Sequence, residues 1–238
     1  MRDFLLDKKI VGAMMVSRCG SILDCTIPEI LKWCDYLVIM FDFPDQRTRE
    51  IVQKHVDNNP GQIETFESGV PNYIGEKNKE FFEESEQGMF KRFNALQGVI
   101  RERMLGHIQD KLRAGEQIDI LVWLDSDEIL CYSMEKTLID FANNYKKHGL
   151  LLRSVEVFDR FDIILPASMN AHTRIIKPSL CQHIQPYRGL AQIWGITKPM
   201  KQRCLYSYAH CQMLTMEKRL WRREHWRARN MEKYFNIS

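Results

Sequence analysis

Three acidic side chains stand within four positions directly after an apolar segment. Residues 118–124 are rich in strand-forming side chains, and Asp125, Asp127 and Glu128 follow them at once. Carboxylates that crowd the end of a buried strand repel one another unless a cation lies between them. Mg²⁺ and Mn²⁺ prefer such oxygen ligands and commonly complete their shell with substrate phosphates. The spacing therefore predicts a metal at Asp125 and Asp127 that holds a diphosphate, and we interpret Glu128 as a solvated side chain.

The segments around this motif predict alternating strands and helices that could position it. Apolar runs at residues 9–17 and 36–41 have the composition of buried parallel strands, and residues 62–66 form a weaker third candidate. Helices are predicted at residues 24–33, 44–56 and 133–147, with a strand at 149–157 after the last of them. The polar residues 67–86 favour a loop or flap. A long helix is predicted before residue 118, because apolar residues recur every three or four positions: Met89, Phe93, Leu96, Ile100, Met104 and Ile108.

This alternation predicts an α/β fold with a mostly parallel central sheet flanked by helices on both faces. In such sheets, ligands bind beyond the carboxyl ends of the strands. Arg18, Asp42 and residues 125–127 all fall at predicted strand ends. We therefore expect them to border one crevice.

Four segments resemble glycosyltransferase family 2 and its relatives with the GT-A fold. LVWLDSDEIL (residues 121–130) is similar to the strand and Asp-x-Asp motif of that family, and IVGAMMVSRC (10–19), DYLVIMFD (35–42) and the helix containing RERML (101–105) are similar to its preceding elements, in the same order. The resemblance implies a GT-A-like (Rossmann-type) sheet with a C-terminal helical extension. It also implies one glycosyltransferase domain over residues 1–238, with a nucleotide-sugar half (1–130) and an acceptor half (131–238).

The resemblance also implies roles for residues in the first half. Ser17 and Arg18 in the loop after the first strand, together with Asp42, would contact the base or ribose of the nucleotide, and Arg101 or Arg103 would lie near it. Asp125 would contact the ribose or the metal. The family usually has a Gly- and Ser-rich stretch after the second strand, where this chain has residues 43–46, Phe-Pro-Asp-Gln.

For the metal itself, the resemblance implies that Asp127 binds both the metal and the diphosphate. The family often adds a late histidine as a metal ligand, and His210 in the segment YSYAH matches it.

Candidates for the catalytic base lie at the end of the predicted strand 149–157 and just after it. An inverting transfer needs a base that deprotonates the acceptor hydroxyl as it attacks opposite the diphosphate. Glu156 and Asp159 are the main candidates, with an ordinary polar strand edge as the competing interpretation. Arg174 and Lys177 are candidate diphosphate contacts or members of an exposed strand.

Composition favours a globular protein of the cytoplasm. Apolar residues at 45 % and charged residues at 27 % fit a folded domain. The first residues lack the layout of a secretory signal, and no apolar stretch reaches the roughly 18 residues of a membrane span. The cysteines are odd in number and form no C-x-x-C pair, so we expect reduced packing residues: Cys19, Cys25, Cys34, Cys131, Cys181, Cys204 and Cys211.

Basic residues gather near the end of the sequence. A helix is predicted over residues 216–234, and it carries two tryptophans and seven basic side chains: Lys218, Arg219, Arg222, Arg223, Arg227, Arg229 and Lys233. A solvated helix and a surface for an anionic acceptor are both compatible with this pattern.

Together these features predict a metal-dependent hexosyltransferase that uses a nucleoside-diphosphate sugar, with UDP-sugar expected, and Mn²⁺ or Mg²⁺. Its acceptor carries a hydroxyl, belongs to no class that the sequence identifies, and could be anionic. Three alternatives stay open: a glycosyltransferase acting on a modified nucleic-acid base, a nucleotidyltransferase, and a nucleic-acid-binding module. The second would need a Gly-rich basic loop after the first strand, where Ser17 to Gly20 supply one Gly and one Arg. The third is disfavoured by the balance of 34 basic against 31 acidic residues.

Overall fold

The computed structural model describes residues 7–17, 19–69, 86–131, 134–158, 160–165, 171–180, 183–185, 192–194 and 201–213. Its helices are α1 (Leu23–Leu31), α2 (Gln46–Asn58), α5 (Glu86–Arg113) and α6 (Met134–Asn143), with short 3₁₀ turns at Gly20–Ile22 and Pro178–Leu180. Its strands are β1 (Ile10–Val16), β2 (Tyr36–Phe41), β3 (Ile63–Glu67), β4 (Ile120–Asp125), β5 (Glu128–Leu130), β6 (Gly149–Phe158), β7 (Arg160–Leu165), β8 (Ala171–Ile176), β9 (His183–Gln185), β10 (Gln192–Trp194) and β11 (Lys201–Met213).

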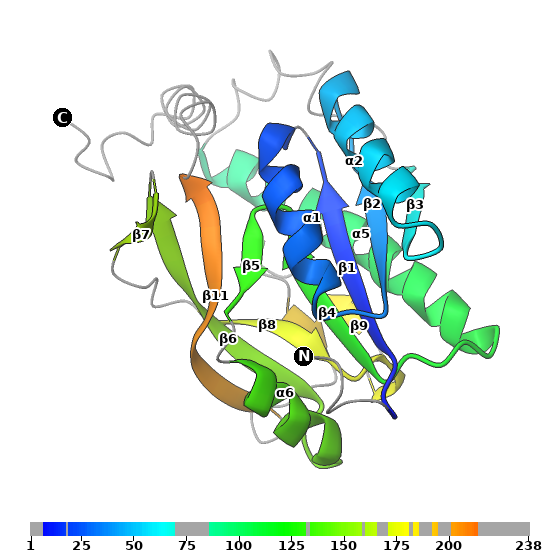
Figure 1. Cartoon of the computed structure of the whole chain (residues 1–238). Coiled ribbons are helices and arrows are strands. Elements are labelled where there is room, and N and C mark those ends of the chain that lie inside the picture. Colours follow the sequence, from blue (N-terminus) through cyan, green and yellow to red (C-terminus); the bar gives the residue numbers. More distant parts are fainter. Residues whose placement is uncertain are drawn as a thin grey trace.

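The predicted α/β alternation is confirmed. Strands β3, β2, β1 and β4 lie side by side and run parallel, which forms the sheet core expected from their apolar runs (Figure 1). The sheet continues through β8, β6, β11 and β5. Strand β8 runs antiparallel to both β4 and β6, whereas β11 runs parallel to β6. Strands β5, β8 and β11 therefore extend the sheet beyond the motif. The sequence did not predict that these three segments would join the sheet.

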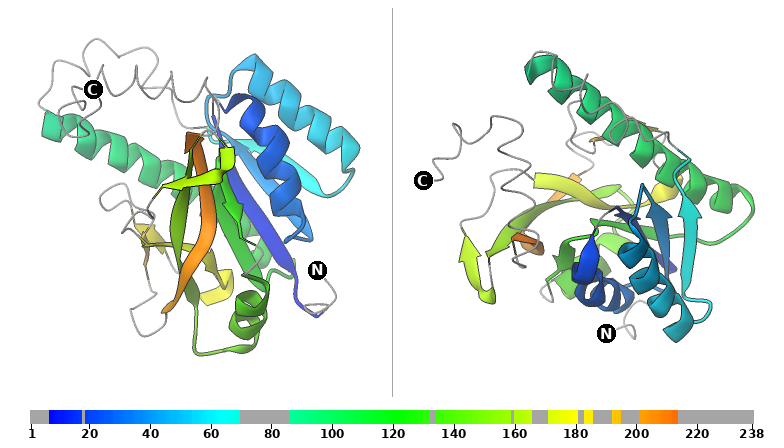
Figure 2. Two further views of the ribbon diagram at one scale, coloured as in Figure 1. Left: turned by 60° about the vertical axis from the view of Figure 1, so that its left-hand side comes forward. Right: turned by 90° about the horizontal axis from the view of Figure 1, so that it is seen from above.

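Helices cover both faces of the sheet, as expected. Alternate residues of β1 face opposite sides: Met14 packs in the cluster that contains α1 and α6, whereas Val11 and Ala13 pack against α5. Seen from above, α5 crosses one face while α1 and α2 cover the other (Figure 2). The two apolar clusters fix the sheet between these layers.

Two glycines with opposite surroundings provide a matched test of this packing. A Cβ added to Gly12 in β1 would lie 2.9 Å from Leu37 Cδ1 and 3.0 Å from Cys34 Sγ. A Cβ added to Gly106, inside α5, would meet nothing within 4 Å. We expect Gly12→Ala to lower the free energy of unfolding by about 1–3 kcal/mol through overpacking. We expect Gly106→Ala to raise it by up to about 1 kcal/mol, because alanine is the better helix former.

Urea denaturation of both variants measures these changes. A Gly12→Ala variant as stable as the wild type would contradict the close approach of β1 to the side chains of Leu37 and Cys34.

Candidate functional site

The carboxyl ends of three parallel strands meet at one edge of the sheet. Ser17 follows β1, Asp42 follows β2, and Asp125 is the last residue of β4. Met15 in β1 pairs with Asp125, and the Asp42 N–H donates to the Val16 carbonyl oxygen at 2.8 Å. The structure thus brings together Asp42 and Asp125, which the sequence predicted to share a crevice, and places Ser17 at the same edge. Arg18 lies outside the described residues.

The turn after β4 is attached to the loop after β1 and to α1. Thr26 Oγ1 donates to the carbonyl oxygen of Ser126 at 2.8 Å. The Cys19 thiol accepts from the Ser17 N–H and lies 3.0 Å from Ser126 Oγ, and the Cys19 N–H donates to Thr48 Oγ1 at 3.1 Å. Cys19, predicted as a packing residue, therefore also connects three loops of the candidate site.

The acidic motif is part of a buried charge cluster. Glu128 is 2 % exposed, so our interpretation of it as solvated is wrong. Its Oε2 accepts from the backbone N–H of Asp125 at 2.9 Å, and its Oε1 accepts from Arg174. Arg174 also donates to Asp125 Oδ2 at 2.8 Å, and Arg101 Nη2 approaches the same oxygen at 3.5 Å. Two arginines thus supply the countercharge that the crowded carboxylates require.

Arg174 and Lys177, three positions apart, reach different places. Arg174, a predicted diphosphate contact, is only 5 % exposed and lies against Asp125. Lys177 lies at the opposite edge of the sheet, where its ammonium group donates to the carbonyl oxygens of Ala142 and Asn144 at the end of α6. Lys177 therefore binds the carboxyl end of helix α6, away from the candidate site.

Asp42 lies in a partly apolar setting at the end of β2. Burial raises the pKa of its carboxyl group, and the hydrogen bond from Ser68 Oγ to Asp42 Oδ1, at 3.3 Å, offsets only part of that rise. The next residue, Phe43, has a φ of 51°, a backbone conformation that costs a non-glycine residue energy and often marks a functional loop. The departure from a Gly- and Ser-rich stretch thus coincides with an unusual turn.

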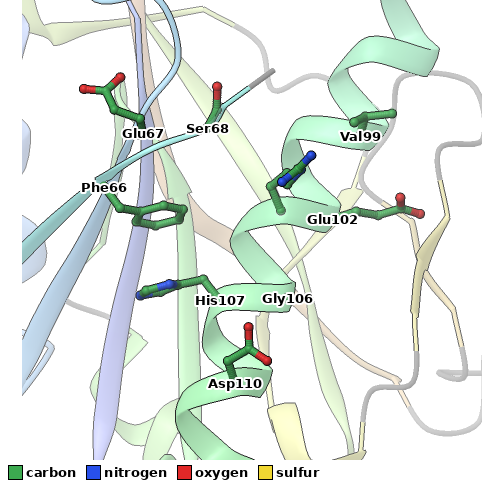
Figure 3. A pocket seen from close by; sticks show the side chains of 9 residues that line it. Phe66, Glu67, Ser68, Val99, Glu102, Gly106, His107 and Asp110 are labelled. Carbon is green, nitrogen blue, oxygen red and sulfur yellow. The ribbon is translucent and has the colours of Figure 1, made fainter. Parts of the chain in front are cut away.

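A pocket of about 380 Å³ opens beside Ser68, between β3 and α5 (Figure 3). Phe66 of β3 and His107 of α5 stack there with ring centroids 4.2 Å apart. Arg103 and Gly106 also line it, and Gly106 leaves space where another residue would carry a side chain. Helix α5 therefore directs Arg101 toward Asp125 and Arg103 toward this pocket, so both arginines that the resemblance offered as alternatives border the site.

Strand β11 places His210 beside the acidic motif. In the sheet register, His210 lies opposite Glu128 of β5 and opposite Glu156 of β6, so the three residues form one row across three strands. The Cys211 N–H donates to the carbonyl oxygen of Asp127 at 2.6 Å. Asp159 and the helix predicted over residues 216–234 lie outside the described residues.

The side chains at this edge fit a metal that a ligand helps to hold. Within the described part of the chain, no group of three or more His, Cys, Asp or Glu side chains is arranged to bind a metal alone. The Asp125 side chain is 27 % exposed, and Asp127 is also partly exposed. Mg²⁺ and Mn²⁺ often use only one or two carboxylates and take their other ligands from substrate phosphates and water. The donor set matches that second type of site.

None of the helices that the structure describes has the length and apolar character needed to cross a membrane.

No family model and no curated protein matches this sequence. The fold is similar to that of TarS from S. aureus: the 1–349 fragment has 12 % sequence identity over 86 % of this chain and 60 % of that one, with a TM-score of 0.50. A longer TarS structure has 14 % identity over 85 % of this chain and 36 % of that one, with a TM-score of 0.52. The 1–349 fragment in complex with UDP has 11 % identity over 84 % and 60 %, with a TM-score of 0.51.

This chain thus spans 60 % of the TarS 1–349 fragment and 36 % of the longer TarS structure, less than two thirds of each. These structural neighbours are GT-A-type glycosyltransferases, and the likeness establishes a GT-A-like fold for the chain.

Proposed function

We propose that the chain is a glycosyltransferase that moves a sugar from a nucleoside-diphosphate sugar, with UDP-sugar as the expected donor, to a hydroxyl group. The observation that carries the proposal is the convergence of Ser17, Asp42 and the Asp125–Asp127 turn at one edge of a parallel sheet. The likeness to TarS, one structure of which contains UDP, adds support.

In this proposal the nucleotide lies across the carboxyl ends of β2, β1 and β4. Its base end faces Asp42 and the pocket beside Ser68, where Arg103 supplies a donor. Asp125 meets the ribose or the metal. Ser17 and Arg18 complete the contacts in the loop after β1. The pocket and the acidic turn would then both lie beside helix α5, which contributes Arg103 to the pocket and Arg101 to Asp125.

The metal, Mn²⁺ or Mg²⁺, would be held by Asp127 with Asp125 and His210 beside it. When bound, it would neutralise the charge that develops on the departing diphosphate. The carbonyl oxygen of Asp127 is held by Cys211, which fixes the backbone from which the carboxylate projects. The partly exposed carboxylate of Asp127 can therefore meet a ligand without disturbing the core.

For the transfer step, we propose Glu156 or Asp159 as the base that takes the proton of the acceptor hydroxyl. Glu156 lies in the same sheet row as His210 and Glu128, at the edge that carries the acidic turn. A base on the acceptor side, opposite the leaving diphosphate, would invert the configuration of the sugar carbon.

The first prediction concerns Asp127. We expect Mn²⁺ to increase the affinity of the wild-type chain for UDP by roughly tenfold or more, because diphosphate oxygens complete the metal shell. Asp127→Asn should lose most of that increase while it keeps the backbone bond to Cys211. Calorimetric titration of UDP with Mn²⁺ and with chelator measures both effects.

The matched control is Asp140→Asn, on the exposed face of α6. An affinity for UDP that ignores both the chelator and Asp127→Asn would refute the metal site.

A second prediction uses the raised pKa of Asp42. A carboxyl group whose pKa is higher in the folded state binds its proton more tightly there, so its ionisation opposes folding at neutral pH. The contribution of Asp42 to the stability of the wild type should therefore rise as pH falls through the folded pKa. Asp42→Asn should be at least as stable as the wild type at pH 7, should lack that gain, and should bind UDP roughly tenfold more weakly through loss of a charged acceptor.

Denaturation curves between pH 7 and pH 4, together with UDP titration, test this prediction. If the variant shows the wild-type pH dependence of stability, burial of the Asp42 carboxylate is not the cause of that dependence. If the variant binds UDP with wild-type affinity, Asp42 is not part of the donor site.

A further inference from the structure

Strand β8 delivers a buried arginine to the acidic motif from the direction opposite to β4. Ile176 pairs with Leu121 and Ile175 with Val122, so the antiparallel course of β8 carries Arg174 toward the carboxyl end of β4. Arg174 is 5 % exposed. An arginine at this depth requires anionic partners, and Asp125 and Glu128 both serve as such partners.

The guanidinium group joins two carboxylates that also hold one another. Arg174 donates to Asp125 and to Glu128, and Glu128 in turn accepts from the backbone N–H of Asp125. Both bonds come from one nitrogen, Nη2, at the far end of the guanidinium group, whereas a lysine would carry its charge on a shorter and more flexible stem. Asp125 is therefore fixed through both its side chain and its backbone.

The cluster is also balanced in charge. Asp125 and Glu128 contribute two negative charges, and Arg101 and Arg174 contribute two positive ones. Arg101 and Arg174 thus offset the charge that the Asp125 carboxylate would otherwise offer to a free divalent cation. Asp127, two residues further on, adds a second carboxylate that is partly exposed.

We propose that Arg174 is a positioning residue that makes metal binding depend on the diphosphate. With Glu128 it holds Asp125 in one orientation for the donor and cancels its charge, so that Asp127 is the main carboxylate offered to the metal. The charge that holds the cation then comes largely from the nucleotide. This role rests on the proposed function.

The experiment compares three variants of the full chain by titration with Mn²⁺ alone and with UDP at saturating Mn²⁺. Arg174→Gln removes one positive charge, so we expect about tenfold tighter binding of Mn²⁺ without nucleotide. Arg174→Gln combined with Glu128→Gln restores the balance and should return that affinity to the wild-type value. Arg174→Lys keeps the charge on a shorter and more flexible stem, so it should leave Mn²⁺ binding unchanged and weaken binding of UDP with Mn²⁺.

The control is Arg153→Gln, which makes the same chemical change at an exposed position of the neighbouring strand β6. It should change neither titration. If Arg174→Gln does not fold, Arg174→Lys still decides the matter through its UDP affinity. Wild-type affinities in Arg174→Lys, or no gain in Mn²⁺ affinity in a folded Arg174→Gln, would overturn the positioning role.

Failure of the proposed function has a separate signature. A wild-type chain that binds no UDP at saturating Mn²⁺ would refute the donor site itself. Normal wild-type binding with unaffected variants would refute only the role of Arg174.

Discussion

The need to balance charge at the end of β4 is the constraint on which the rest of this structure depends. A buried strand that ends in Asp125 and leads into a buried Glu128 is stable only if positively charged side chains from other elements pair with these carboxylates. Helix α5 supplies Arg101 from one face of the sheet, and β8 supplies Arg174 from the adjacent strand position. The placement of α5 and β8 is thus tied to the chemistry of a four-residue motif.

A second set of interactions joins the turn after β4 to the loop after β1. Buried hydroxyl groups of Thr26 and Thr48 hold the turn at Ser126 and the loop at Cys19, so the ends of β1 and β4 keep a fixed relation. These bonds join helix and loop atoms far apart in the sequence. Thr26 and Thr48 therefore support the site edge through hydrogen bonds within the protein.

The sequence allowed the parallel core and its order of elements to be predicted, because β1, β2 and β4 are nearly continuous apolar runs and α5 has a clear helical period. It did not reveal β5, which has three residues, or β11, in which polar and apolar residues mix. The burial of Glu128 was missed because its partner, Arg174, lies 46 positions away, and local pattern contains no sign of that pairing. The convergence of Asp42 and Asp125 could be predicted from strand ends, and Arg101 was suggested by the family resemblance. The connecting role of Cys19 could not be predicted, since it depends on tertiary contacts.

Strand β3 lies at one end of the sheet order, and its outward side chains are charged. Glu64 binds both His107 and Lys111, and Glu67 binds Arg49. Burial alone would lower the pKa of Lys111, but its hydrogen bonds to carboxylates outweigh this and raise it, so the ammonium group stays charged over the whole physiological range. An exposed strand edge with unpaired backbone groups invites pairing with other chains, and short charged strands resist it. The same ion pairs that attach α5 to β3 therefore also oppose aggregation of one molecule with the next through this edge.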